Sequence, residues 1–145
     1  MRSLSLFLIV TAFIGLASTP TDDAKKDLEK FQGAWQATLV VGVDGAPAPE
    51  SDVMATRLVV QGNQFTLKTK DGMVKGTFAI DPSRTPKAIE FTLEGQPASE
   101  KFLGIYRIDG DERRSCFAVP GKDRPTNLEP RVPGYLYFGW KRQAP

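Results

Sequence analysis

Histidine is absent from the 145 residues of this chain, and Cys116 is its only cysteine. Without histidine, neither a Ser-His-Asp nor a Cys-His site can be built, and the commonest acid–base group near neutral pH is missing. A pair of carboxylates could still act as acid and base. The candidate aspartates all fall in predicted turns, where the residue is favoured for backbone reasons. We therefore expect no enzymatic activity and no cofactor. The turn aspartates are Asp44, Asp71, Asp81, Asp109 and Asp111.

The densest acidic cluster is Asp109-Gly110-Asp111-Glu112. Acids around a glycine suggest calcium, but four residues lack the oxygen-rich loop that a calcium site needs. A hairpin turn between two strands explains the same residues. We expect no metal site here.

The best candidate for a binding site is the proline-rich loop at residues 120–134, because long ordered loops in compact domains usually have a function. Lys122, Arg124 and Arg131 make it basic, and Thr126 is a neutral hydrogen-bond donor. Arg124-Pro125-Thr126 could hold a carboxylate or a phosphate. In the alternative interpretation, Arg124 pairs with a local acid such as Asp123 or Glu129. It would then only pin the loop over the end of the fold.

Cys116 lies within a predicted strand, beside Phe117. A small buried hydrophobic residue is the default interpretation of such a cysteine. An intermolecular disulfide or a reactive thiol is the alternative.

The N-terminus has the pattern of a signal peptide. A positively charged start is followed by an apolar run from residue 4 to 16, and Gly15-Leu16-Ala17 offers small residues for cleavage after Ala17. The run is shorter than the ~20 residues of a membrane span. We expect residues 1–17 to be removed on export to the periplasm or the exterior; a retained anchor is the alternative. The net charge of +2 gives no electrostatic argument for nucleic-acid binding.

The rest of the chain alternates short strands with turns. A short helix from Thr21 to Lys30 leads into a first strand whose alternation predicts one buried face. Asp71-Gly72 is the strongest hairpin signal. The later strands are predicted at 57–61, 64–70, 74–80, 87–94, 102–109, 113–119 and 135–142. The predicted inner face of the first strand consists of Trp35, Ala37, Leu39, Val41 and Val43.

Eight short antiparallel strands joined mostly by tight turns predict an all-β domain over residues 22–142. We favour an eight-stranded antiparallel up-and-down barrel over a sandwich, because sequential hairpins close a meander without long crossovers. The register of strand 102–109 stays open, since both of its faces are apolar. The predicted interior has no convergent polar groups. It comprises Trp35, Leu39, Phe65, Leu67, Phe78, Ile89, Phe91, Leu136 and Phe138.

The short helix, the Gly33-Ala34-Trp35 segment and the eight strands resemble the lipocalin superfamily, which begins with a glycine-x-tryptophan motif. More closely, the chain resembles a family of exported lipocalin-like proteins expanded in planctomycete bacteria, over about residues 27–142. The resemblance implies a barrel fold and an exported location, but no reaction. It also implies that a basic residue, Arg142 or its neighbour Lys141, lies across Trp35, with Gly33 structural; the alternative is that these two side chains are simply solvated. Trp140 is expected to be a structural core residue. The matching segments are 28–35 (LEKFQGAW), 44–47 (DGAP), 76–83 (GTFAIDPS), 86–89 (PKAI), 102–106 (FLGIY) and, most specifically, 116–126 (CFAVPGKDRPT).

We therefore expect an exported, monomeric, non-catalytic protein that binds a small apolar molecule or a cell-envelope partner. The alternative is a solid barrel that serves as a structural or interaction module. Strands shorter than those of typical lipocalins argue against a deep cavity, and we expect weak ligand binding or none. The candidate ligand-binding residues are Arg124, Thr126, Phe65, Phe78, Phe91 and Tyr106.

Overall fold

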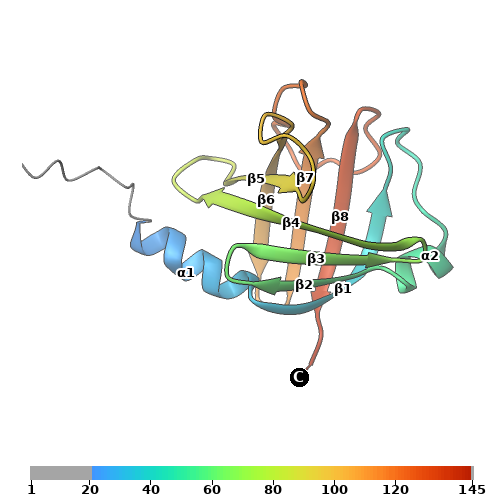
Figure 1. The fold of residues 1–145 in the computed structure, drawn as a ribbon, viewed down its shortest axis with the longest axis horizontal. Helices are drawn as coiled ribbons and strands as arrows, with labels where there is room; N and C mark the ends of the chain where they lie inside the picture. Colours follow the sequence, from blue (N-terminus) through green and yellow to red (C-terminus); the bar gives the residue numbers. More distant parts are fainter. Residues whose placement is uncertain (1–20, 145) are drawn as a thin grey trace, which may run out of the picture.

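The computed structural model describes residues 21–144, which form a closed antiparallel barrel of eight strands preceded by one helix (Figure 1). Each strand pairs with the next along the chain, and β8 pairs with β1 to close the barrel. The predicted fold class is confirmed. The predicted signal peptide at residues 1–17 lies outside the described residues. No helix in the described part of the chain is long and apolar enough to span a membrane.

The elements begin and end within about two residues of the predicted bounds. The helices are α1 (Asp22–Phe31) and α2 (Glu50–Met54). The strands are β1 (Gly33–Val41), β2 (Arg57–Gln61), β3 (Gln64–Thr69), β4 (Gly72–Asp81), β5 (Ala88–Leu93), β6 (Phe102–Asp109), β7 (Glu112–Ala118) and β8 (Tyr135–Arg142).

The two ends of the barrel differ. The helix end carries the β2–β3, β4–β5 and β6–β7 turns and the start of β1, where α1 packs. The side chain of Gln32, just after α1, holds the β2–β3 turn by donating to Gly62 O (2.9 Å) and accepting from Gly62 N (2.7 Å). The loop end carries the other four connections, including α2. Figure 1 shows α1 at the lower left and α2 at the right.

The alternation predicted for the first strand is correct only in its first half. Trp35 and Ala37 face the interior, but the register against β8 shifts between Ala37 and Leu39. Such a bulge inserts one extra residue and reverses the faces that follow it. Val40 therefore packs with the interior, while Leu39 and Val41 belong to a cluster on the outer wall. The predictions that Leu39, Val41 and Val43 face inward are wrong; Val43 lies beyond the end of β1 and is exposed.

The loop at residues 120–134 covers the outer wall. Val41, Ile105, Cys116 and Tyr137 form a buried cluster outside the barrel, against which Leu128 of the loop packs. The interpretation that this loop lies over the barrel end is therefore wrong. Cys116 is a free, buried thiol, as its default interpretation predicted. Burial raises its pKa to about 11, so the thiol stays protonated at neutral pH.

The sequence left open which face of β6 points into the barrel, and the packing of its side chains decides it. Phe102 and Tyr106 pack with the interior, whereas Ile105 belongs to the outer cluster. Gly104 lies on the inner face beneath the ring of Phe117, where an added Cβ would be only 2.4 Å from that ring. The absence of a side chain at this position leaves room for the Phe117 ring against the wall.

Candidate functional site

The barrel encloses a cavity of about 230 Å³. Its walls come from α1 and from every strand except β1, and all but two of the lining side chains are apolar. At the helix end the lining is tightly buried: Phe31 is 1% exposed and Trp140 is 4% exposed. At the loop end Val74 is 38% exposed. The cavity therefore has its floor at the helix end and its mouth at the loop end.

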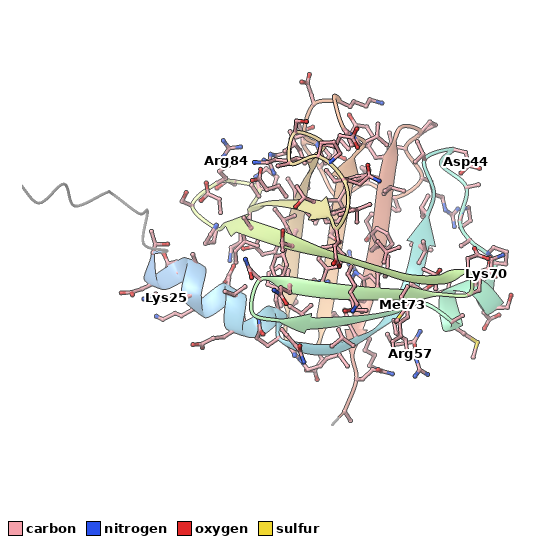
Figure 2. All side chains as sticks on the ribbon, in the orientation of Figure 1. Lys25, Asp44, Arg57, Lys70, Met73 and Arg84 are labelled. Carbon is pink, nitrogen blue, oxygen red and sulfur yellow. The ribbon has the colours of Figure 1, made fainter. Side chains whose placement is uncertain are left out.

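The mouth lies beside the β3–β4 hairpin. Lys70 and Met73 belong to this hairpin, and Figure 2 shows Lys70 on the side of the molecule opposite Lys25 of α1. Met73 is 61% exposed and points away from the cavity, whereas its neighbour Val74 lines it. Val74 thus lies on the inner surface of the mouth, and its neighbour Met73 lies on the outer surface.

Arg113 of β7 lies at the floor of the cavity and is only 5% exposed. Its guanidinium carbon is 4.7 Å from the ring centroid of Phe31, 4.9 Å from that of Trp35 and 5.9 Å from that of Trp140. Its Nε and Nη1 atoms are buried without a hydrogen-bond partner. Within residues 21–144, no carboxylate lies within ion-pair distance of it. Three aromatic rings thus surround this buried cation.

Burial, with a smaller effect of the nearby Arg142 cation, lowers the pKa of Arg113 to about 9. The side chain therefore stays protonated at neutral pH. A buried charge is costly unless it is paired and hydrogen-bonded, and cation–π contacts offset only part of that cost. The second polar group of the lining is Ser115, two residues along β7, which is 3% exposed.

Arg113 and Ser115 were not among the predicted interior residues, so the prediction of an interior without convergent polar groups is wrong. The alternation along β7 is a partial signal for them. Phe117 shares their face, because alternate residues of a strand point the same way. The register then places Arg113 opposite Trp140, an interior residue of β8. A predicted buried Cys116 favoured the opposite phase, but β7 is buried on both faces from Ser115 to Ala118.

Four of the predicted ligand-binding residues lie inside the barrel, and the other two, Arg124 and Thr126, lie outside it. Phe65, Phe78 and Phe91 line the cavity. Tyr106 is buried near the floor but does not line the cavity, and its hydroxyl donates to Asp27 Oδ2 (2.7 Å). Burial and this carboxylate raise the pKa of Tyr106.

Arg124 and Thr126 lie outside the barrel, apart from the cavity. Arg124 Nη1 donates to Ile89 O (2.8 Å) and Gly104 O (2.6 Å), and Nη2 lies 3.9 Å from Glu90 Oε2. Burial and the neighbouring Arg84 lower the pKa of Arg124. The acid that it meets is Glu90, not Asp123 or Glu129 as the alternative interpretation predicted. Thr126 is exposed. The guanidinium fastens the loop to the outer wall.

The predicted structural residues meet at the helix end. Trp35 is fully buried, and its indole Nε1 donates to Phe31 O (2.8 Å). The guanidinium carbon of Arg142 lies 4.3 Å from its ring centroid, and Arg142 Nη1 donates to Gln32 O (2.6 Å). Gly33 has φ +104°, which disfavours any side chain. Trp140 forms part of the cavity floor.

No family model, curated protein or solved structure matches the chain. The closed eight-stranded barrel is compatible with a lipocalin-like fold. Among the described residues, no group of three or more acidic or cysteine side chains is placed to hold a metal ion.

Proposed function

We propose that the chain is an exported, non-catalytic, lipocalin-like binding protein that holds a small apolar molecule inside its barrel. The supporting observation is the apolar cavity of about 230 Å³, closed at the helix end and exposed at the loop end. Binding sites for small molecules are typically concave and mostly apolar, with a few placed polar groups. The absence of histidine from the sequence supports the non-catalytic part of the proposal.

The cavity volume limits the size of the ligand. A cavity of ~150 Å³ holds benzene, so the same packing gives room for roughly nine non-hydrogen atoms here. An eight-carbon chain with its head group has nine or ten non-hydrogen atoms and fits with its far end in the open mouth. Since each buried methylene stabilises by ~0.8 kcal/mol, the seven methylenes of 1-octanol would give a Kd on the order of 0.1 mM.

The location and family membership belong to the same proposal. The apolar N-terminal run supports export. The Gly33-Ala34-Trp35 start, the preceding helix and the Arg142–Trp35 contact support membership of the exported lipocalin-like family that the sequence resembles. The outer surface could bind a cell-envelope partner while a small molecule fills the barrel.

Calorimetric titration with 1-octanol tests the proposal, with tryptophan fluorescence as a second readout because Trp140 lines the cavity. We expect one site of sub-millimolar affinity. Val74→Trp, at the inner surface of the mouth, should weaken binding at least tenfold. Met73→Trp, one residue away on the outer surface, is the matched control and should leave binding unchanged. If the folded protein binds no octanol or other small neutral molecule, the barrel is a structural or interaction module instead.

A further inference from the structure

The cavity floor holds hydrogen-bond donors without acceptors. Aromatic rings lie near the Arg113 guanidinium, but its N–H groups point outward in the guanidinium plane and need oxygen acceptors. Nε and Nη1 have none, although both atoms are buried. Native proteins rarely leave such groups unpaired, so an unpaired buried cation in a cavity suggests that a bound ligand supplies the acceptors.

The second polar group of the lining is also a possible donor. Ser115 shares the inner face of β7 with Arg113, and two residues along a strand span about 7 Å. Its hydroxyl can donate to a group that the guanidinium also contacts. Toward the mouth the lining is apolar, with Leu67, Leu93 and Leu136. The polarity of the site thus changes from cationic at the floor to apolar at the mouth.

We propose, building on the binding function above, that the ligand is a small aliphatic or aromatic carboxylate whose head group binds Arg113 at the floor. A carboxylate has two oxygens in one plane, which matches the paired N–H groups of a guanidinium. It neutralises the buried charge while its apolar tail fills the rest of the cavity. A phosphate group would need more donors than Arg113 and Ser115 supply. An amine would place a like charge against Arg113.

The test compares octanoate with octanamide, which has the same number of non-hydrogen atoms and no charge. Both are titrated calorimetrically into the full mature chain at about pH 7.4, where the carboxyl group is ionised. We expect octanoate to bind about 10- to 100-fold more tightly, the range typical of hydrogen bonds to a charged group. This comparison needs no substitution, so it does not depend on whether a variant folds.

Variants then assign the preference to Arg113. Arg113→Met should bring the two affinities within about threefold of each other while octanamide still binds. Arg113→Lys keeps the charge without the planar fork and should retain only part of the preference. Arg114→Met is the matched control, because Arg114 is the next residue of β7 and is exposed. It should keep the full preference for octanoate.

The head group's position gives a separate prediction of the same proposal. A bromine quenches tryptophan emission at short range, and Trp140 lies at the floor. 2-Bromooctanoate should therefore quench more strongly than 8-bromooctanoate. Equal affinities of octanoate and octanamide, or a preference that survives in Arg113→Met, would overturn the carboxylate proposal and leave the apolar binding site standing. If neither compound binds, both proposals fail.

Discussion

The guanidinium groups of Arg113 and Arg142 both lie over the ring of Trp35, but their surroundings differ. Arg142 is partly exposed and donates to Gln32 O, so it fastens the chain preceding β1 to the end of β8. Arg113 is buried, and its Nε and Nη1 have no acceptor. Arg142 has hydrogen-bond acceptors as well as the indole, so its contact is structural. Arg113 lacks acceptors for two of its nitrogens at the cavity floor, which the proposed ligand would explain.

The contact between Trp35 and Arg142 can be measured by a double-mutant cycle in urea. Trp35→Ala removes a fully buried indole, and the void should lower the free energy of unfolding by ~3–5 kcal/mol. Arg142→Ala should cost ~0.5–2 kcal/mol. The double variant should lose less than the sum, because removing the ring also removes the surface on which the cation lies. Strict additivity would contradict an energetic contact, and a Trp35→Ala loss below ~1 kcal/mol would exclude Trp35 from the core.

Among the elements, α1 decides which end of the barrel is closed. Its Phe31 ring enters the interior, and Asp27, 6% exposed, accepts hydrogen bonds from Tyr106 Oη and from Lys87 Nζ (2.8 Å). These contacts join the helix to β6 and to the β4–β5 turn. Ten residues form too short a helix to be stable alone, so α1 depends on this docking.

Asp27 makes this docking dependent on pH. Burial alone would raise its pKa, but hydrogen bonds from Lys87 and Tyr106 outweigh burial and hold the pKa below its usual value. In acid, the Asp27 carboxylate therefore binds a proton more readily in the unfolded chain than in the folded one. The stabilisation that Asp27 gives to the fold is complete above about pH 4 and is lost as the pH falls through its folded-state pKa.

Asp27→Asn should lower the free energy of unfolding at neutral pH by ~1.5–3 kcal/mol, the range of a hydrogen bond to a charged group. Urea denaturation at a series of pH values should show the gap to the unsubstituted protein closing below about pH 4. Asp22→Asn, in the exposed first turn of the same helix, is the control and should change stability little. A gap that stays constant into acid would mean that the Asp27 carboxylate does not stabilise the docking.

For the whole molecule, a buried cation without a counter-ion should make the empty barrel less stable than it could be. Replacing buried charges with apolar residues of similar size is often neutral or stabilising by ~1–4 kcal/mol. Conversely, a ligand at 100 times its Kd stabilises the protein that binds it by ~2.7 kcal/mol. The empty barrel and the occupied barrel should therefore respond oppositely to the loss of Arg113.

Arg113→Met should leave the ligand-free protein as stable as the unsubstituted chain, or more stable by up to ~3 kcal/mol. About 1 mM octanoate should then stabilise the unsubstituted chain by ~2–3 kcal/mol and the variant much less. Thermal and urea unfolding with and without octanoate measure both effects. A large loss of stability in the ligand-free variant would instead show that the cation–π contacts make Arg113 a structural residue.

The sequence by itself determined the number, order and approximate bounds of the strands. Period-two alternation in segments such as Gln64–Thr69, with turn residues such as Asp71-Gly72 between them, acts over a few neighbouring residues and can be followed along the chain. The same alternation identified Phe65, Phe78 and Phe91 as interior, and all three line the cavity.

Only the tertiary structure decided the phase of β7, the bulge in β1 and the position of the loop at residues 120–134. The second half of β7, from Ser115 to Ala118, is buried on both faces, so the alternation alone could not tell whether Cys116 or Arg113 faces inward. The register against β8 decides it, because Arg113 lies opposite the interior residue Trp140. The bulge follows from the closure of β1 against β8, about a hundred residues away along the chain. The cavity is the volume left when eight strands close, so no short segment of sequence specifies it.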